Sequence, residues 1–315
     1  MPTEIQEIRN PKSGIRRDLF TTLLFLLPNL LGFLAFTVGP VLASLLLSFT
    51  VWDLLTWPPK FCGFDNFVEL LGFRRGSAGW EANDPRFWQY MWNTVFYMFF
   101  IPVSMGLSLG MALLFNRKLP GVVAFRTLYF LPTICSAVSM AVLWKWLYNA
   151  DFGLINFLLA KIGIQGPEWL DSVAWAKPAI AIMGLWAGLG GFNTILYLAA
   201  LQDVSRDLQD AASIDGANAW QRFLYVTWPS ISPTTFFVFI MSVIGGFQGG
   251  FLQAFMMTGG GPAGATTTID YYIYNKAYAW LKMGSASAIA WVLFIVVFVV
   301  TLINWRFGEE KVEYV

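Results

Sequence analysis

One group of acidic side chains in this sequence has the spacing that acid–base chemistry could use. Its members recur about every four residues, which would place three of them on one face of a helix. The group consists of Asp203, Asp207, Asp210 and Asp215. Paired carboxylates act as general acid and base in sugar-cleaving enzymes. The chain has no histidine, however, so the commonest general base and metal ligand is missing.

Metal and nucleotide chemistry find no support in the sequence. Cys62 and Cys135 are far apart and form no CxxC pair, so neither a disulfide framework nor a zinc site is expected. The chain also lacks the GxxxxGK[ST] phosphate loop, and its net charge of +1 gives no sign of nucleic-acid binding. We expect no metal site and no cofactor in this chain.

The amino-acid composition indicates whether the chain is surrounded by water or by lipid. Hydrophobic residues make up 57% of the 315 residues and charged residues 12%, and the mean hydropathy is +0.58. Soluble domains have about 45–50% apolar and about 25% charged residues. A chain of this length cannot bury so much apolar surface in water, so it is predicted to be an integral membrane protein.

Uncharged runs predict six membrane-spanning helices, since about 20 apolar residues cross the hydrocarbon layer. The runs are 19–52, 87–116, 127–144, 178–202, 223–269 and 283–305. The third is short and reaches the full length if Lys145 extends to the membrane surface. The fifth contains several prolines and is expected to hold one span near 234–256. The first is too long for a signal peptide, and we expect one helix bent near Pro28 and Pro40.

The spans divide the chain into a cytoplasmic tail (1–18), a transmembrane domain (19–306) and a second cytoplasmic tail (307–315). With both termini inside, slightly more than half of the 20 lysines and arginines lie on the cytoplasmic side, and the positive charges before the first span favour this orientation. No span contains an interior aspartate or glutamate. Proton- or sodium-coupled carriers keep such groups at membrane depth, so energy must enter elsewhere.

The loop 203–229 between the fourth and fifth spans predicts two short helices. Ser205 is a plausible N-cap, and Gly216 suits the left-handed position after a helix. The second helix places Trp220 and Phe223 on one face and is expected to stop before Pro229. Such a loop could dock into a groove on a soluble partner, or it could lie at the lipid headgroups.

The loop resembles the EAA loop of ABC-importer permeases. Asp210-Ala211-Ala212 is followed after three residues by Gly216, and the pattern ends at Pro229. Two further motifs resemble the carbohydrate-uptake subgroup: the stretch Thr258 to Pro262, and the proline- and glycine-containing first span. The chain departs from the pattern where Asp210 replaces the usual glutamate and Trp228 the usual leucine.

The resemblance implies an all-α type I permease with six transmembrane helices in a bacterial inner membrane. It is expected to pair with a second permease, with two cytosolic ATPases that bind ATP and magnesium, and with an external solute-binding protein. The chain itself would then not be an enzyme. The residues expected to couple it to the ATPases are Asp210, Ala211, Ala212, Asp215, Gly216 and Pro229.

Glycine-rich stretches in spans four and five mark the expected substrate pathway. Glycines four residues apart fit close helix packing, but so many within one helix also weaken it. In permeases of this kind the matching stretches line the substrate cavity. The candidates are Trp186, Asn193, Gln248, Gly249, Gly250 and Gln253, with Asn93 and Thr133 as weaker ones.

Two questions about function stay open at this point. The uncharged candidates favour a neutral saccharide or polyol, although glycerol 3-phosphate or another charged solute is an alternative. The rival class is a polytopic membrane enzyme acting on a lipid-linked sugar through the four loop aspartates.

Overall fold

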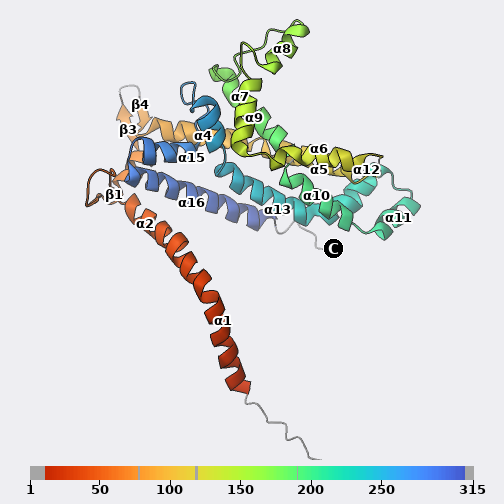
Figure 1. Cartoon of the computed structure of the whole chain (residues 1–315), viewed down its shortest axis with the longest axis horizontal. Coiled ribbons are helices and arrows are strands. Elements are labelled where there is room, and N and C mark those ends of the chain that lie inside the picture. Colours follow the sequence, from red (N-terminus) through yellow and green to blue (C-terminus); the bar gives the residue numbers. More distant parts are fainter. Residues whose placement is uncertain (1–10, 77–78, 118–119, 190, 309–315) are drawn as a thin grey trace, which may run out of the picture.

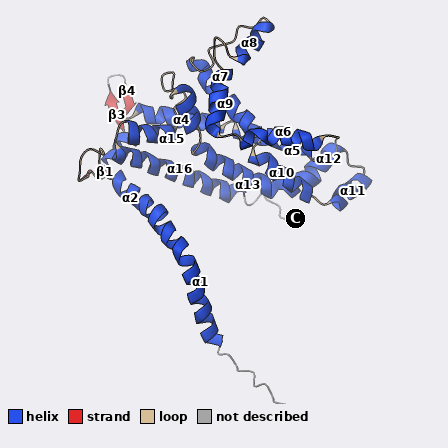
Figure 2. Cartoon of the chain, viewed as in Figure 1, coloured by secondary structure: helices blue, strands red, loops and turns tan. Residues whose placement is uncertain are grey.

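The computed structural model describes residues 11–76, 79–117, 120–189 and 191–308, which are mostly helical with two short hairpins (Figure 2). Five described helices are long and apolar enough to cross a membrane, and a bent pair makes a sixth crossing if it counts as one span. The five are Thr21–Ser48, Pro85–Phe115, Val173–Asp203, Ala219–Thr258 and Met283–Arg306. The predicted all-α fold with six spans is confirmed, although two spans are shaped differently from the prediction.

The third span, predicted over 127–144 as one helix, is a broken pair. α6 (Val122–Ile134) and α7 (Ala137–Leu147) are bent by 99° at the residues between them. Pro132 lies in the last turn of α6, and Ser136 starts α7 anew by capping it with its hydroxyl. Proline removes a backbone donor from the helix, so the chain bends here and does not continue as one helix.

The first span runs through α1 (Pro11–Phe33), a widened π-helical turn η1 (Leu34–Val38) and α2 (Gly39–Ser48). The widened turn comes directly before Pro40, where a bend was predicted, whereas Pro28 lies inside α1 without interrupting it. α2 packs along the last helix, but α1 stands away from the bundle (Figure 1). The remaining parts of the predicted tails, 1–10 and 309–315, lie outside the described residues.

Two small hairpins and one short helix connect the first and second spans. β1 (Thr50–Val51) pairs with β2 (Lys60–Phe61), and β3 (Phe73–Gly76) pairs with β4 (Gly79–Ala82), both antiparallel. α3 (Asp65–Leu71) lies between the hairpins. Together they cover the end of the bundle at which the second span begins (Figure 1).

The rest of the chain forms the bundle and one projecting arm. Its longer helices are α4 (Pro85–Met98), α5 (Ile101–Phe115), α9 (Val173–Leu189), α10 (Phe192–Asp203), α13 (Trp228–Phe247) and α16 (Met283–Gly308). The shorter elements after α13 are α14 (Phe251–Gln253), η3 (Ala254–Thr258), α15 (Ile269–Tyr274) and η4 (Asn275–Ala279). α8 (Leu154–Lys161) projects from the bundle with the outer ends of α7 and α9 (Figure 1).

The loop before the fifth span differs from the prediction at its second helix. α11 (Arg206–Ile214) is separate, but α12 (Ala219–Arg222) continues through the π-helical turn η2 (Phe223–Thr227) directly into α13. The helix therefore does not stop before Pro229. Proline at the start of α13 lacks an amide hydrogen, and the widened turn before it accommodates the missing bond without ending the helix.

Three apolar clusters hold the bundle together. The first joins α4, α13, α15 and α16 around Phe87, Phe247 and Ile289. The second joins α5, α10 and α13, with Tyr197 and Ile231 fully buried. A third, smaller cluster joins α7, α9 and η3. The last cluster explains why the bent α7 is not displaced from the bundle, since it packs beside the end of the fifth span.

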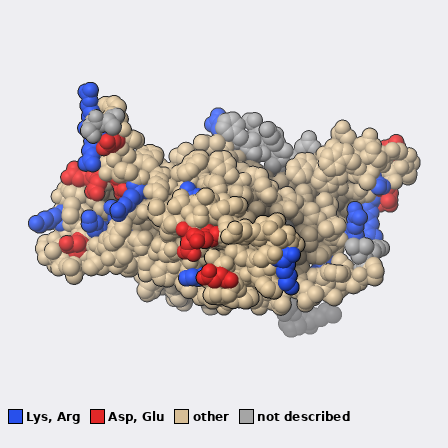
Figure 3. All heavy atoms as spheres, turned by 90° about the horizontal axis from the view of Figure 1, so that it is seen from above, with Lys and Arg blue, Asp and Glu red and all other residues tan. Residues whose placement is uncertain are grey.

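Charged side chains gather at the two ends of the long axis and in a smaller group between them, with wide uncharged surface separating them (Figure 3). One end carries the hairpins, and the opposite end carries α11 and α12 (Figure 1). At the hairpin end, a buried ion pair joins Lys276 Nζ to Asp84 Oδ2 at 3.7 Å, and the Tyr272 hydroxyl donates to the same carboxylate. Such a pair persists in a buried site because each charge has a partner.

Asn93, a weaker pathway candidate, has a structural role. Its side chain is fully buried, and its amide Nδ2 donates to the carbonyls of Gly264 and Thr267 at 2.9 and 2.8 Å. It thereby ties the loop between η3 and α15 to α4. The side chain is not available to a solute.

Replacing Asn93 by Leu should lower the stability of the purified protein. Two buried carbonyls would lose their donor, which costs about 1–3 kcal/mol. The measurement is the apparent Tm in detergent from tryptophan fluorescence. Asn83→Leu is the matched control, because Asn83 makes a comparable bond to Val68 on the exposed surface. Equal melting of both variants would contradict the role assigned to Asn93.

Candidate functional site

A cavity of about 310 Å³ lies between the second, fourth and fifth spans. It is lined by α4 and α5 on one side, by α9 on another, and by α13 and α14 on the third. Hydroxyl and amide groups enter it from Tyr97, Ser104 and Gln253, and Phe100 adds an aromatic ring. No charged side chain is among its described lining residues. Neutral hydrogen-bonding groups beside aromatic rings suit a polar, uncharged surface such as that of a sugar.

The fifth span is interrupted where it meets this cavity. α13 ends at Phe247 with Gln248 as its C-cap, and the chain turns at Gly249 and Gly250 before α14 begins. Gly250 has a φ of +93°, and a Cβ there would lie 2.6 Å from the Thr268 side chain. Only glycine fits such a backbone without strain. The loosening predicted from the glycine-rich sequence is therefore observed as a break.

The glycines of the two stretches divide into packing and cavity positions. Gly188 and Gly246 pack on the second span: an added Cβ would lie 2.4 Å from the Ser104 hydroxyl and 3.2 Å from Met98, respectively. Gly184 and Gly245 have nothing within 4 Å of an added Cβ and line the cavity, and Gly246 is also among its lining residues. Both explanations for the glycine pattern thus apply: Gly188 packs, Gly184 and Gly245 face the cavity, and Gly246 does both.

Three of the six predicted pathway residues line the cavity, namely Gly249, Gly250 and Gln253. The other three lie elsewhere. Trp186 packs edge-on against Trp144 of α7 with ring centroids 5.4 Å apart, and Asn193 donates to the Ser242 hydroxyl at 3.3 Å. Gln248 is exposed at the end of α13 and does not line the cavity.

Thr133, the remaining weak candidate, donates its hydroxyl to the Phe130 carbonyl in the last turn of α6. This bond satisfies a carbonyl near the proline in the same turn. The cavity does not include Thr133.

From the second span, sequence reasoning named only Asn93 and missed the residues that line the cavity. Tyr97, Ile101 and Ser104 recur at helical spacing and face the cavity. The Tyr97 hydroxyl is buried and has no hydrogen-bond partner among the described residues. A helical stripe containing two hydroxyls in an otherwise apolar run is the signal that could have identified this face.

Asp270, in α15, forms hydrogen bonds that stabilise the chain where the fifth span is interrupted. Its carboxylate accepts hydrogen bonds from the Thr268 hydroxyl at 2.6 Å and from the backbone amides of Phe251 and Tyr271. The starts of α14 and α15 thus share one capping group. Burial raises the pKa of Asp270 above its ordinary value, and these hydrogen bonds oppose that shift.

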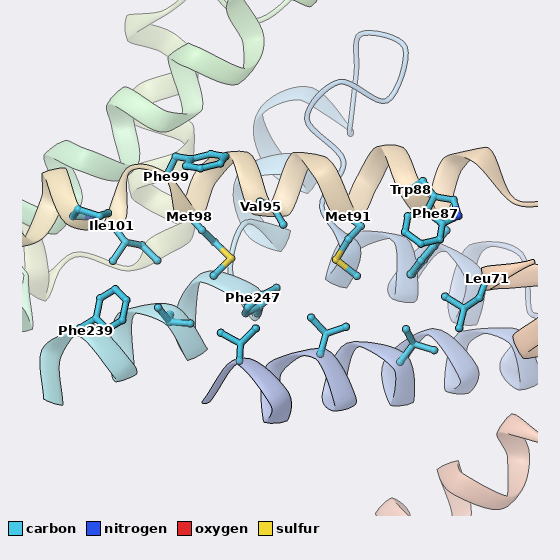
Figure 4. A pocket seen from close by; sticks show the side chains of 15 residues that line it. Leu71, Phe87, Trp88, Met91, Val95, Met98, Phe99, Ile101, Phe239 and Phe247 are labelled. Atoms are coloured by element: carbon cyan, nitrogen blue, oxygen red, sulfur yellow. The ribbon is translucent and has the colours of Figure 1, made fainter. Parts of the chain in front are cut away.

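A second, larger hollow is apolar throughout. It has a volume of about 560 Å³ and runs along α4 opposite α13 and α16 (Figure 4). Met91, Val95 and Met98 point into it from α4, and Phe239 and Phe247 from α13 (Figure 4). It offers no amide, hydroxyl or charge to orient a sugar. The smaller polar cavity is therefore the better candidate for a solute.

The loop at the opposite end of the bundle has a defined turn. After α11, the amide of Gly216 donates to the Ser213 carbonyl at 3.2 Å and that of Ala217 to the Ala212 carbonyl at 2.9 Å. This pattern is a Schellman motif, and Gly216 has the left-handed φ of +80° that it requires. The predicted turn at Asp215-Gly216 is confirmed. Ser205 occupies the predicted N-cap position but makes no capping hydrogen bond.

Side-chain bonds hold the two helices of the loop at a fixed angle. Arg222 donates to the Ser213 hydroxyl at 3.0 Å, and Gln209 donates to the Thr227 hydroxyl at 2.9 Å. Asn218 and Gln221 form a capping box that starts α12. The loop is therefore a rigid unit on the end of the fifth span.

The outer surface of this unit is exposed in the part of the chain that the structure describes. The predicted coupling residues Asp210, Ala211, Asp215 and Gly216 are exposed, and Ala212 is half-buried. Ile214 is 86% exposed and Trp220 66%. Pro229 is half-buried at the start of α13.

Comparisons with known proteins agree on one family. Residues 103–307 match the family described as "Binding-protein-dependent transport system inner membrane component". The chain belongs to this family. The permease is 34% identical over 306 residues to the probable ABC transporter permease protein YesP of Bacillus subtilis (strain 168), covering 96% of this chain and 94% of YesP.

Two further comparisons extend this result. The permease is 36% identical over 296 residues to the lactose transport system permease protein LacF of Rhizobium radiobacter, covering 91% of this chain and 94% of LacF. Its fold matches a chain of a bacterial ABC transporter that imports the acidic polysaccharide alginate, with a TM-score of 0.81, 24% identity, and coverage of 97% and 100%.

Membership in this family decides between a transporter permease and a membrane enzyme. The resemblance to carbohydrate-uptake ABC permeases is confirmed, and the permease is a multi-pass protein of the inner membrane. Its relatives are permeases, so the prediction that the chain is not an enzyme holds and the lipid-linked-sugar enzyme is discarded. The four loop aspartates are not an active site.

The assignment of glycines to packing or cavity positions predicts which of these positions are accessible to water. In a background with Cys62 and Cys135 replaced by Ser, Gly245→Cys should react nearly completely with a membrane-impermeant maleimide, because its side chain enters the cavity. Gly188→Cys is the matched control and should stay unlabelled, because Gly188 does not line the cavity and its added side chain would pack against the Ser104 side chain. Labelling is measured by mass shift on the native membrane. Equal labelling at both positions would contradict the assigned cavity.

The left-handed conformation of Gly216 predicts that two substitutions there destabilise the loop to different degrees. Gly216→Val should destabilise the turn by about 1–2 kcal/mol, because a branched side chain is strained in the left-handed region. Gly216→Asn should cost less, since asparagine tolerates that conformation. Hydrogen exchange of peptides covering 206–222 measures the difference. Equal exchange in both variants would argue against a strained position.

Proposed function

We propose that this permease is one transmembrane subunit of an ATP-driven importer for a saccharide or polyol, and that its α11–α12 loop couples it to an ATPase. The observation that carries the proposal is the continuity of the fifth span. One uninterrupted helix begins in the loop at Ala219 and ends at Phe247, beside Gly245 and Gly246 of the cavity region. A rigid helix transmits a displacement of its end along its length, so movement of the loop would alter the cavity.

The chemistry of the loop suits a protein partner in the cytosol. Asp210 is an exposed carboxylate without an ion pair among the described residues, and Ile214 and Trp220 are large exposed apolar groups on the same loop. Exposed aromatic residues beside a charge are typical of interface centres. The partner would bind ATP and magnesium, since this chain has no phosphate loop. Two ATPase subunits are expected, one for each of two permeases.

The first span supports a second permease as partner. None of the residues in its apolar window is buried within this chain, and α1 leaves the bundle (Figure 1). α2 of this span packs on α16, whereas the exposed α1 is available for packing on another subunit. The described lining of the cavity comes from three spans, and a second permease would supply the remaining wall.

Delivery of the solute is assigned to the end that carries the hairpins. This end lies opposite the coupling loop, which places it outside if the loop and both termini are cytoplasmic (Figure 1). An external solute-binding protein would dock there. The neutral hydroxyl and amide groups of the cavity then receive a saccharide or polyol.

Asp210→Asn should uncouple the importer. Removing a charge that pairs across an interface weakens binding by about 1.4 kcal/mol or more, which is at least a tenfold rise in Kd. The measurement is affinity of the detergent-purified permease for its co-expressed ATPase, together with solute-stimulated ATP hydrolysis in proteoliposomes.

Asp207→Asn serves as the control for the loss of charge, because Asp207 lies on α11 outside the matched motif. It should retain both ATPase binding and stimulation. If the Asp210 variant binds and stimulates the ATPase as the unmodified chain does, the loop does not couple through this carboxylate.

A further inference from the structure

A third hollow, of about 660 Å³, lies between the end of α5 and the start of α6. Apart from one phenol hydroxyl its lining side chains are apolar, and they include Met111, Leu114, Phe115, Phe125, Leu128 and Tyr129. Leu114 is 48% exposed, and Phe125 and Leu128 are each 67% exposed. The hollow therefore opens onto the surface of the chain. It lies toward the end of the bundle that carries α11 and α12 (Figure 1).

The position of this hollow along the spans places it at the depth of lipid. Its walls are the last turn of the second span and the first turns of the third. From Val122 to Tyr129 the axis of α6 rises about 10 Å, which is less than the ~15 Å of hydrocarbon in one leaflet. Apolar walls give water too few hydrogen-bond partners. The occupant must therefore be an acyl chain or an apolar group of another protein.

An arginine lies at the edge of the hollow. The Arg126 guanidinium donates from Nη2 to the carbonyl of Phe115, whose side chain lines the hollow. On α6, Arg126 follows the lining residue Val122 by four residues and precedes Tyr129 by three, so the three share a face. Its Nε is buried without a hydrogen-bond partner among the described residues. Long helical side chains lean toward the N-terminus, which here is the end where the span leaves the membrane.

The charge around the hollow is positive. Arg117 follows the end of α5 by two residues and is exposed. Neither Arg117 nor Arg126 has an ion pair in the part of the chain that the structure describes. In the sequence, no aspartate or glutamate occurs between Pro85 and Ala150. Basic groups beside an apolar hollow at the membrane surface complement an amphiphile with an anionic head.

We propose that this hollow binds an anionic phospholipid of the leaflet at the α11–α12 end. One acyl chain would lie between α5 and α6, and the phosphate would accept hydrogen bonds from Arg117 and Arg126. An apolar helix of a second permease could fill the hollow, but an occupant with an anion at its end also pairs with the two arginines. The inference does not depend on the import function proposed above.

The rival explanation is that Arg126 only caps α5. Arginine near a helix C-terminus commonly bonds to the last carbonyls, and the bond to Phe115 is of this kind. Arg117 separates the two explanations, because its backbone amide bonds to the Leu114 carbonyl at 3.2 Å while the structure gives its side chain no bond among the described residues. Replacing its side chain leaves the cap in place and removes only a positive charge.

The first test measures lipid binding to the full purified chain after removal of native lipid. Native mass spectrometry follows titration with dioleoyl phosphatidylglycerol, with phosphatidylcholine of the same chains, and with dioleoylglycerol, which has no phosphate. The variants are Arg117→Gln and Arg126→Gln. Arg206→Gln is the matched control, because Arg206 is an exposed arginine on α11 and none of the helices that line the hollow contains it. Size-exclusion chromatography checks that each variant is folded.

We expect phosphatidylglycerol to bind more tightly than phosphatidylcholine, and dioleoylglycerol to bind most weakly. Arg117→Gln should raise the Kd for phosphatidylglycerol about fivefold, which corresponds to about 1 kcal/mol for one basic residue at a membrane surface. Arg126→Gln should raise it at least as much, and Arg206→Gln should leave it unchanged. Inorganic phosphate at the same concentration should not displace the lipid, because phosphate has no chain to fill the hollow.

A second pair of variants tests the acyl chain. Val122→Phe adds volume to a residue that lines the hollow, and it should weaken the binding of both phospholipids. Val123→Phe is its matched control, since Val123 is the next residue of α6, is 72% exposed and does not line the hollow. It should bind both lipids as the unmodified chain does.

The last test is made in the native membrane, where any partner subunit is present. Phosphatidylglycerol with a photoactivatable diazirine in its acyl chain should crosslink to peptides covering 111–129, and Val122→Phe should abolish the crosslink. Equal affinity for phosphatidylglycerol and phosphatidylcholine, an unchanged Kd in Arg117→Gln, or equal binding by the Val122 and Val123 variants would overturn the proposal. Binding by the purified chain without a crosslink in the native membrane would also overturn it, because a protein would then cover the hollow.

Discussion

The structure depends on one constraint: within hydrocarbon, each backbone amide and carbonyl must find its partner inside the protein. Helices satisfy this rule automatically, so every break in a span requires a local substitute. The break at Gln248–Gly250 has one in Asp270, whose carboxylate accepts from the Phe251 amide at the start of α14 and is itself held by the Thr268 hydroxyl. The break between α6 and α7 has one in Ser136. At these two breaks, side chains supply hydrogen bonds that the interrupted helices lack.

The same constraint explains why the polar cavity lies where it does. An interrupted helix exposes backbone groups that lipid cannot satisfy but that water or a sugar can. Gly184 and Gly245 leave room beside the break, and Tyr97 and Ser104 line the opposite wall. The apolar hollow along α4 differs, because the side chains that line it need no polar partner.

The continuous helix from Ala219 to Phe247 connects the two functional regions without an intervening hinge. Its N-terminal end is braced against α11 by Arg222 and Gln209, and its C-terminal end borders the cavity. The widened turn at Phe223–Thr227 keeps the helix intact through Pro229. Had the helix stopped there, as the sequence suggested, a displacement of the loop would not reach the cavity along a rigid element.

The sequence by itself determined the medium, the number of crossings, and the turn in the loop before the fifth span, because these depend on composition and short-range spacing. Gly216 is an example, since its left-handed conformation follows from a local pattern. Only the tertiary structure decided which glycines pack and which face the cavity, and that Trp186 and Asn193 point to other helices. Those outcomes depend on how the helices are rotated relative to each other. The periodicity along one helix does not specify which other helix packs against each of its faces. The 99° bend after α6 belongs with them, because it is held by the packing of α7 on α9 and η3.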